Sequence, residues 1–313
     1  MTARRPPARG AALLLAMLIL SLVAVLAAAM VRHQQRAIEI EAAERARTQA
    51  GWVLNGAIDW ARLILREDAR SGPVDHEGEP WAVPLAEARL STFLAADQSN
   101  NVDADLDAFI SGRIVDLQSR YNLVRVAADD GKPVEPELAA LRRLCEAAGL
   151  GGDVADRLGR GMVNALDGGS ADGPLRPRRL SQLTWLGLDA PTLAQLEGLV
   201  VLLPVRTPVN ANTAPREVLL AAIDGIDLGT AERIVQARQR APLRSIPELR
   251  NLLPEGVTVD EGRVGVGSSF FLVQGRVRLE DRVVEERAVI ERRPGGGEVL
   301  VRQRERVSLA PAR

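Results

Sequence analysis

The chain has 313 residues, enough for about two domains, and it carries 40 Lys and Arg residues against 41 Asp and Glu residues. This near-balance argues against a protein that binds nucleic acid through bulk positive charge. The single cysteine, Cys145, excludes an intrachain disulfide, and two histidines are too few for a three-histidine metal centre. At 46% hydrophobic and 26% charged residues, the composition is that of a globular chain.

The first predicted element is an apolar segment of 21 residues, Ala11 to Val31, in which Ser21 is the only polar side chain. A helix of this length spans the hydrocarbon core of a bilayer, ~30 Å. Arg4, Arg5 and Arg9 precede the segment, which favours a cytoplasmic N-terminus and a chain body on the other side. A cleaved signal peptide and a plain single-span anchor are the alternatives, although a signal peptide has a shorter apolar region.

The helix is expected to continue beyond the membrane. No proline occurs between Val31 and Arg70, and small and aliphatic residues recur there at spacings of three and four. This pattern predicts an amphipathic stem that continues the apolar span to about residue 70. The Ser71-Gly72-Pro73 sequence then predicts the end of the helix.

The body of the chain alternates between strand and helix patterns. Trp81 to Phe93 has the spacing of a short helix or turn, and period-2 alternation predicts strands over Arg113–Leu117 and Leu123–Val126. Residues 127–262 have helical patterns, and residues from 263 onward alternate again as an antiparallel meander. Strands on both sides of a helical block predict an α+β fold in which a sheet receives an insertion.

One part of the helical block has the order helix, tight turn, helix. Thr213 fits the N-cap of the first helix with Pro215 in its first turn, and the turn is Gly225-Ile226-Asp227. This order resembles a helix-hairpin-helix unit, which often binds DNA phosphates through backbone N–H groups. Asp224 and Asp227 would present the wrong charge to phosphates, so a compact helical domain for protein contacts is the preferred interpretation. The basic residues after the turn, Arg233, Arg238, Arg240 and Arg244, then form a solvated face.

Three motifs, taken together in their order, resemble the type II secretion system protein K family, the large minor pseudopilins. The first is the basic leader ending in Arg9-Gly10 before the apolar segment, which is similar to a type IV prepilin leader. The second is the segment Asp116-Leu117-Gln118-Ser119-Arg120-Tyr121-Asn122-Leu123, similar to the family's Asp-x-x-Gly-Arg-Phe-Asn-Leu. The third is Thr207-Pro208-Val209-Asn210-Ala211-Asn212-Thr213-Ala214, similar to the family's Pro-x-Asn-Val-Asn-Thr-Ala.

The resemblance implies a pilin-like α+β fold with a long N-terminal transmembrane helix and an antiparallel sheet, carrying a large all-α insertion domain of helix-hairpin-helix or SAM-like type. The domains expected from it are the prepilin leader at 1–10, the transmembrane helix and stem at 11–70, the pilin-like domain at 71–126 and 263–313, and the inserted helical domain at 127–262. It implies an inner-membrane protein with a cytoplasmic N-terminus and a periplasmic body, and no enzymatic activity.

The resemblance also implies processing and partners. Prepilin peptidase is expected to cut between Gly10 and Ala11, and Ala11 is then N-methylated. Most pilins have Glu as the fifth mature residue, whereas this chain has Leu15, which suits a subunit at the filament tip because no preceding amine needs neutralising. The implied partners are minor pseudopilins I and J in a heterotrimer, other pseudopilins, and the secretin or the exported cargo.

Calcium is the one metal that the resemblance brings into question. Family members often carry acidic calcium-binding stretches, and the matching region here is reduced to Asn164, Asp167 and Asp172. Calcium requires 6–8 oxygen ligands, so an ordinary Asp/Gly turn explains these residues equally well. A membrane-anchored, DNA-binding protein of the competence type remains the alternative to the pseudopilin hypothesis.

Overall fold

The computed structural model of the chain describes residues 9–91, 108–167, 174–279, 282–293 and 297–308. The chain divides into two compact units, residues 1–53 and 54–313. Helix α1 (Arg9–Ser71) begins in the first unit and ends in the second. The predicted continuous helix is therefore confirmed, and it ends at the Ser71-Gly72-Pro73 signal.

The first unit consists of the apolar and polar parts of α1. Its large apolar side chains between Leu13 and Val31 are 51–70% exposed, and α1 contains a segment long and apolar enough to cross a membrane by length and composition. The hydroxyl of Ser21 donates to the carbonyl of Met17, so the helix backbone satisfies the one polar side chain of this segment. The backbone N–H and C=O groups of a helix hydrogen-bond to one another and need no water, so a helix can cross the hydrocarbon core of a bilayer.

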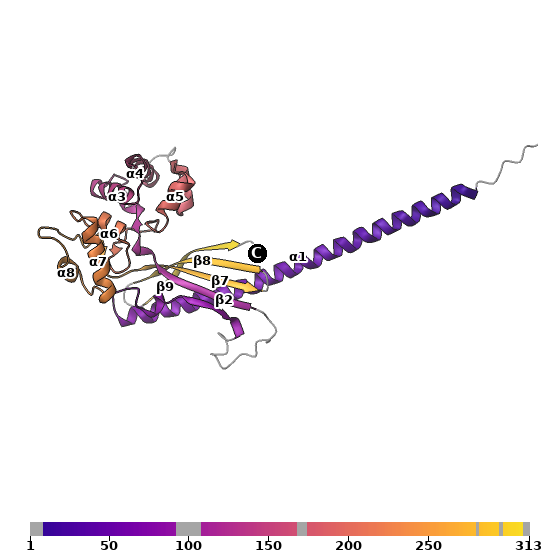
Figure 1. Cartoon of the computed structure of the whole chain (residues 1–313), viewed down its shortest axis with the longest axis horizontal. Coiled ribbons are helices and arrows are strands. Elements are labelled where there is room, and N and C mark those ends of the chain that lie inside the picture. Colours follow the sequence, from indigo (N-terminus) through magenta and orange to yellow (C-terminus); the bar gives the residue numbers. More distant parts are fainter. Residues whose placement is uncertain (1–8, 92–107, 168–173, 280–281, 294–296, 309–313) are drawn as a thin grey trace, which may run out of the picture. The chain divides into compact units, whose positions relative to one another are not determined.

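The second unit contains a five-stranded antiparallel sheet with the order β1-β2-β7-β8-β9. Strands β7 and β8 carry alternating buried and less buried residues, as expected for a sheet with one covered face. The predicted antiparallel meander is confirmed. Figure 1 shows the strands side by side, and their bounds are β1 (Leu85–Arg89), β2 (Ala108–Asp116), β7 (Phe270–Leu279), β8 (Arg282–Arg292) and β9 (Val299–Ser308).

The last turns of α1 cover this sheet. Ile58, Ala61 and Leu65 are buried and pack with residues of β7 and β8 in one apolar cluster. The ring of Trp81 meets the ring of Phe271 edge to face, with centroids 5.2 Å apart. Helix on sheet is the layered packing by which each element buries its apolar face.

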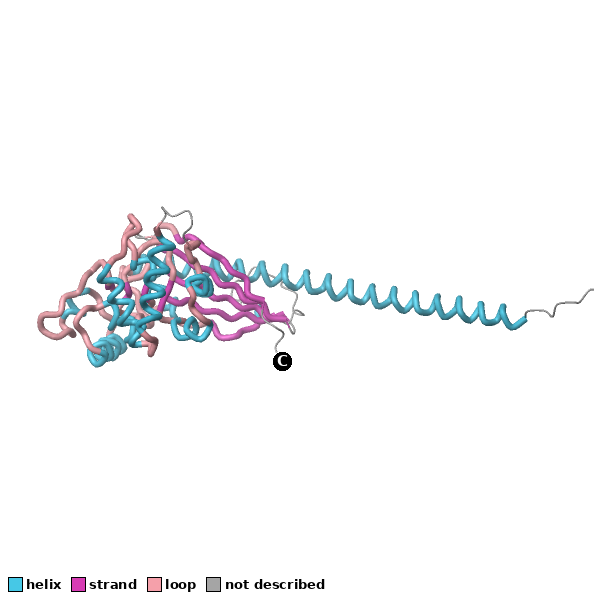
Figure 2. Tube along the Cα trace, turned by 90° about the horizontal axis from the view of Figure 1, so that it is seen from above, coloured by secondary structure: helices cyan, strands magenta, loops and turns pink. Residues whose placement is uncertain are grey.

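A group of short helices lies in the chain between the paired strands β2 and β7 (Figure 2). Two short parallel strand pairs, β3 with β4 and β5 with β6, hold its loops together. Its members share a separate apolar core of Leu, Val, Ile and Ala side chains. The bounds are η2 (Leu117–Ser119), β3 (Tyr121–Asn122), η3 (Leu123–Val126), α3 (Glu135–Ala147), α4 (Gly152–Leu166), η4 (Leu180–Leu186), α5 (Ala190–Leu196), β4 (Val200–Val201), β5 (Val209–Asn210), α6 (Arg216–Ala222), α7 (Leu228–Arg240), α8 (Ile246–Arg250) and β6 (Val264–Gly265).

Three local predictions are wrong. Leu123–Val126 forms the 3-10 turn η3 and not a strand, because the Asn122 side chain caps this turn by accepting from the N–H of Val124. The short helix or turn predicted over 81–93 is wrong for its middle: the segment begins in the short turn η1 (Pro80–Ala82), but the strand β1 follows and pairs with β2. Residues 92 and 93 lie outside the described residues. Thr213 is not the N-cap of α6; Pro215 occupies that position, and the hydroxyl of Thr213 donates to Asp116.

Candidate functional site

The side chain of Asp116 lies at the centre of a buried polar network where the sheet meets the helical group. It ends β2 and caps η2, because its Oδ1 atom accepts from the N–H of Gln118 at 2.7 Å. Its Oδ2 atom accepts from Thr213 Oγ1 at 2.6 Å, Ser268 Oγ at 2.6 Å and Asn210 Nδ2 at 3.0 Å. One carboxylate thus joins three separate parts of the sequence, the segments around positions 116–118, 210–213 and 268.

Further hydrogen bonds connect the second and third sequence motifs, residues 116–123 and 207–214. Asn122 Nδ2 donates to the carbonyl of Val205 at 2.8 Å and to Thr207 Oγ1 at 3.2 Å. Gln118 Nε2 donates to the carbonyl of Pro208 at 3.0 Å. The structure therefore brings the segments 116–123 and 207–214 into direct contact through their polar side chains, which explains why both carry amides.

The hydrogen bonds to the Asp116 carboxylate come from other residues of the chain. Burial raises the pKa of the Asp116 carboxyl above its usual range, and the bonds from Ser268, Thr213, Gln118 and Asn210 offset part of that effect. Asp116 is only 2% exposed, so its donors come from within the chain. Buried groups that satisfy one another hold segments in register, and this arrangement acts as a structural joint.

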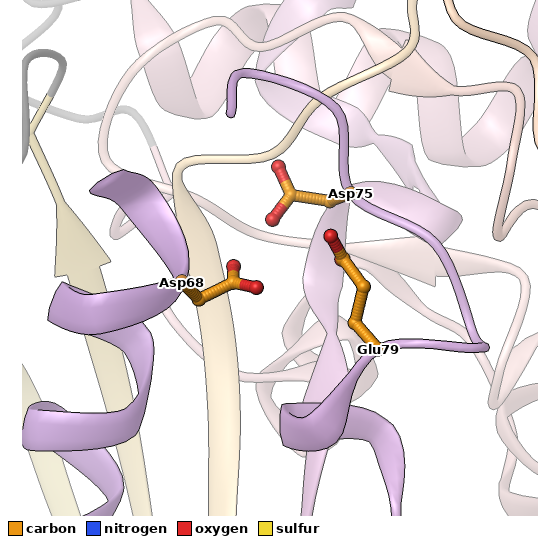
Figure 3. A group of neighbouring side chains, drawn as sticks. All are labelled: Asp68, Asp75 and Glu79. Carbon is orange, nitrogen blue, oxygen red and sulfur yellow. The ribbon is translucent and has the colours of Figure 1, made fainter. Parts of the chain in front are cut away.

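A second polar group lies beside the first, where the segment after α1 meets β8. The side chains of Asp68, Asp75 and Glu79 point toward one another (Figure 3), and one carboxylate oxygen of each lies within 4.8 Å of the others. Arg292 donates to Asp68 Oδ2 at 2.6 Å and to both carboxylate oxygens of Asp75 at 2.5 and 2.6 Å. The N–H of Ser268 donates to Asp75 Oδ2 at 2.7 Å. Arg292 therefore pairs with two of the three carboxylates, and the group is an ion-pair cluster.

The protonation of this cluster depends on burial. Burial raises the pKa of Asp75 from 3.8 to about 7, and Arg292 opposes part of that rise. The third carboxylate, Glu79, accepts from Trp81 Nε1 at 2.7 Å and from the N–H of His76 at 2.9 Å. Arg292 is shared between Asp75 and Asp68, so the two carboxylates have one cation between them.

The residues predicted to undergo processing lie in the first unit. Gly10 and Ala11 belong to the first turns of α1, and Leu15 lies on the same helix with 61% of its surface exposed. Because Leu15 stands where most pilins have Glu, the apolar segment of this chain has no carboxylate at this position. Cleavage and methylation stay predictions.

The calcium prediction concerns the end of α4. Asn164 and Asp167 are both exposed, at and just beyond the last turn of that helix, and Asp172 lies outside the described residues. The two described side chains supply fewer oxygen ligands than calcium needs. The calcium site therefore stays a prediction.

The α6–α7 unit has a Gly turn with φ +83° at Gly225, as the helix-hairpin-helix pattern requires. The side chain of Asp227 accepts from the N–H of Thr230 and caps α7, so it occupies the helix N-terminus where a phosphate would bind. Arg238 donates to the carbonyls of Ala211 and Ala214 and thus stabilises the fold. These contacts disfavour DNA binding at this hairpin.

Cys145 is part of the apolar core of the helical group. It is buried on α3 among apolar side chains, and burial raises the pKa of its thiol to about 11. A thiol with so high a pKa is a poor nucleophile at neutral pH.

Sequence reasoning missed Asp75, Ser268 and Arg292. A signal for Arg292 exists in the alternation of β8, because it follows Ala288 and Ile290 at steps of two and so faces the covered side of the sheet. An inward-facing arginine needs a buried partner. Asp75 and Ser268 lie in loops, where no periodic spacing of apolar residues indicates which side chains are buried.

Comparison with known proteins agrees with these observations. The family model described as type II secretion system protein K matches residues 209–266, which include positions 209–214 of the 207–214 motif and α6–α8. The chain is 29% identical to the type II secretion system protein K of Pseudomonas aeruginosa, covering 87% of this chain and 85% of the relative. It is 28% identical to that of Pectobacterium carotovorum, covering 95% and 96%.

The chain is therefore similar over most of its length to type II secretion system protein K. Proteins of that family are minor pseudopilins, which are structural proteins. The fold agrees, because a chain of the GspK-GspI-GspJ complex from enterotoxigenic Escherichia coli matches with a TM-score of 0.59 at 17% identity, over 85% of this chain and 99% of that chain. In this chain, the network around Asp116 is the joint between the sheet and the helical group.

Proposed function

We propose that this minor pseudopilin forms the tip of a type II pseudopilus together with minor pseudopilins I and J, where it initiates and caps the pseudopilus during export of folded proteins across the outer membrane. The observation that carries the proposal is the similarity to two protein K relatives over most of their length and of this chain. The GspK-like fold, found in a complex with GspI and GspJ, supports it. Other pseudopilins and the secretin or the cargo are further partners.

Copurification tests the complex directly. The full chain, coexpressed with the I and J subunits of its own secretion system and extracted in detergent, is expected to elute with both in one peak. The matched control replaces this chain by an unrelated protein with the same α1 segment, which separates a complex of folded domains from association of membrane helices. A chain that elutes alone while I and J elute together contradicts the proposal.

We also propose that prepilin peptidase cleaves after Gly10 and that the new N-terminus at Ala11 is methylated. The support is the glycine between the basic leader and the apolar segment, since glycine permits close approach of an enzyme to the backbone. Mass spectrometry of the membrane-extracted chain is expected to find Ala11 first, with one methyl group. The variant Gly10→Val should retain the leader, whereas Gly56→Ala, deeper in α1, should be processed normally. A mature chain that starts elsewhere is incompatible with this proposal.

The tip position follows from Leu15 in this proposal. A carboxylate at this place in the bilayer costs free energy unless a neighbouring amine pairs with it. The variant Leu15→Glu should therefore reduce the amount of chain in tip complexes, whereas Leu15→Ile should not. Equal incorporation of the two variants would remove Leu15 as a marker of the tip.

Membrane orientation is part of the same proposal. The charge bias of Arg4, Arg5 and Arg9 supports an inner-membrane anchor with a cytoplasmic N-terminus and a periplasmic body. Alkaline phosphatase, which is active only outside the cytoplasm, is expected to be active when fused after residue 313. An inactive C-terminal fusion combined with an active fusion near residue 8 would reverse the orientation.

The proposed domains are a leader at 1–10, a transmembrane helix and stem at 11–70, a pilin-like domain at 71–126 and 263–313, and a helical insertion at 127–262. The insertion is proposed to be of helix-hairpin-helix or SAM-like type. The Gly225 turn between α6 and α7 supports this assignment, and the direct pairing of β2 with β7 supports the insertion.

A further inference from the structure

The sheet of the second unit has one face that α1 covers and one that it does not. Ile114 of β2 and its register partner Val273 of β7 pack with the last turns of α1. Successive residues of a strand point to opposite faces, so Arg113 and its register partner Gln274 lie on the face away from α1. That face carries the polar side chains of the central strands.

Three arginines from three adjacent strands lie together on this face, and we call them the arginine patch. Arg113 of β2 and Arg287 of β8 are the register partners of Gln274 on its two sides, and Arg276 follows Gln274 by two residues on β7. All three arginines are exposed. The sheet register thus places three positive charges around one uncharged amide side chain.

One glutamate neutralises part of the charge of this patch. Glu285, the register partner of Arg276, accepts from Arg287 Nε at 2.7 Å. Arg113 Nε donates to the amide oxygen of Gln274, which carries no charge. Within the described ranges, neither Arg113 nor Arg276 has a carboxylate at ion-pair distance. Three arginines and one glutamate leave two positive charges in excess here, whereas the whole chain has a net charge of -1.

The charged residues beside the patch pair with one another and leave this excess unchanged. Glu305, the register partner of Arg287 on β9, accepts from Arg179 at 3.0 Å. Toward the opposite edge of the sheet, Glu87 of β1 accepts from Arg278 Nε at 2.7 Å. The excess charge is therefore local, and acidic residues border it on both sides.

The chain by itself gains no stability from this arrangement. Like charges on neighbouring strands destabilise a sheet. The side chain of Arg276 makes no hydrogen bond or ion pair with another residue in the part of the chain that the structure describes. A partner that supplied carboxylates to Arg113 and Arg276 would remove the repulsion.

We propose that the arginine patch binds an acidic surface of another protein. A guanidinium and a carboxylate form paired, charge-assisted hydrogen bonds. Arg113 and Arg276 stand diagonally across β2 and β7, where residues are about 7–8 Å apart. Carboxylates on alternate residues of an extended strand are about 7 Å apart, so two of them match the two uncompensated charges.

The surroundings of the patch disfavour other anions. A nucleic acid strand or an anionic bilayer would extend beyond the patch and meet Glu87 and Glu305. Sites for small acids are concave and bury most of the ligand, whereas these three arginines are exposed on a sheet face. This inference goes beyond the tip-complex proposal, and its test needs neither of the proposed partner subunits.

Fluorescence anisotropy measures peptide binding to the full chain in an uncharged detergent. The probe is a peptide with blocked ends and an uncharged dye, in which three glutamates alternate with threonine, and its control has glutamine in place of glutamate. The acidic probe is expected to bind at about 20 mM NaCl and to bind about threefold more weakly at about 300 mM, because salt screens exposed charges. The glutamine probe should bind about fivefold more weakly than the acidic probe. No binding of the acidic probe, or equal binding of both probes, overturns the proposal.

Two double variants locate the binding. Arg113→Gln with Arg276→Gln removes the two uncompensated charges and should weaken binding of the acidic probe about fivefold. The matched control, Arg240→Gln with Arg244→Gln, removes two exposed arginines of the helical group and should leave binding unchanged. Equal losses in both double variants would mean that net charge alone attracts the probe, and the proposal would be wrong. If the first double variant fails to fold, Arg276→Gln alone should weaken binding about twofold, and unchanged binding in that variant contradicts the proposal.

A third probe decides between an acidic protein and a nucleic acid. Single-stranded DNA of about 15 nucleotides, with the same dye, should bind more weakly than the acidic peptide because Glu87 and Glu305 repel its phosphates. Tighter binding of the DNA than of the peptide, lost in Arg113→Gln with Arg276→Gln, would assign the patch to nucleic acid and overturn the proposal.

Discussion

Arg292→Met removes the guanidinium that joins the segment after α1 to β8. Methionine keeps much of the volume and the contact with the Phe271 ring, over which the guanidinium now lies at 4.9 Å. What disappears is the charge and the bonds to Asp68, Asp75 and the carbonyl of Ser268. The substitution therefore separates electrostatics from packing.

The expected loss of unfolding free energy in Arg292→Met follows from the burial of its two carboxylate partners. The side chains of Asp68 and Asp75 are 8% and 1% exposed, so each carboxylate would lose its cation in a place that water hardly reaches. Breaking a buried ion pair on one side costs about 3–5 kcal/mol. Domains are stable by about 5–15 kcal/mol, so the variant should lose a large part of its stability.

The double variant Arg292→Met with Asp75→Asn gives the sharper result. Replacing both partners removes the uncompensated charge, so the double variant should be more stable than Arg292→Met alone. Arg293→Met is the matched control, since Arg293 is 52% exposed and pairs with the exposed Glu298; its loss should be below about 0.5 kcal/mol.

Urea unfolding of the full chain in detergent, followed by circular dichroism and tryptophan fluorescence, measures these values. Trp81 packs on Phe271 and so reports on the same region. A loss below about 1 kcal/mol in Arg292→Met, or a double variant less stable than the single one, would refute the reasoning.

Three further predictions concern the same region. Because the pKa of Asp75 is raised to about 7, the folded chain binds a proton more tightly than the unfolded chain. The free energy of unfolding should therefore fall as pH rises from about 4 to 7. Urea titrations at several pH values measure this slope, and Asp75→Asn should flatten it. Asp116→Ala leaves buried donors without their acceptor and should cost about 3–5 kcal/mol of unfolding free energy, whereas Ser268→Ala, which removes one donor, should cost about 1 kcal/mol. Gly267→Ala should prevent folding or lower the unfolding midpoint strongly, because its Cβ would lie 2.2 Å from the carbonyl oxygen of Pro73, whereas Gly56→Ala, with open space around it on α1, should stabilise by about 0.5–1 kcal/mol.

The elements that were predicted correctly have long, regular patterns. The apolar segment and stem of α1, the strands β7, β8 and β9, and the helices α3 and α4 repeat their pattern over ten or more residues, so period alone identifies them. Short elements depend on tertiary contacts instead. Leu123–Val126 alternates like a strand, yet it turns because Asn122 caps it, and nothing in the alternation reveals that cap.

The sequence predicted only part of the network around Asp116. Asp116 and Asn210 were within the recognised motifs, but the motifs gave no indication that one bonds to the other at 3.0 Å. Their partner Ser268 lies 152 positions from Asp116. Pairing at such separations is decided by the topology of the sheet, because β2 and β7 must lie side by side before Ser268 reaches Asp116.

The placement of buried polar groups shows what the fold must hold in register. Apolar packing tolerates many arrangements, whereas a buried carboxylate with several donors permits one. In this chain the two networks share Ser268, whose N–H binds Asp75 and whose hydroxyl binds Asp116. The segment after α1, the end of β2 and the start of β7 are therefore fixed to one another at a single residue. A joint built from directional bonds keeps the end of α1 and the sheet in a constant relation, where apolar contacts alone would allow sliding.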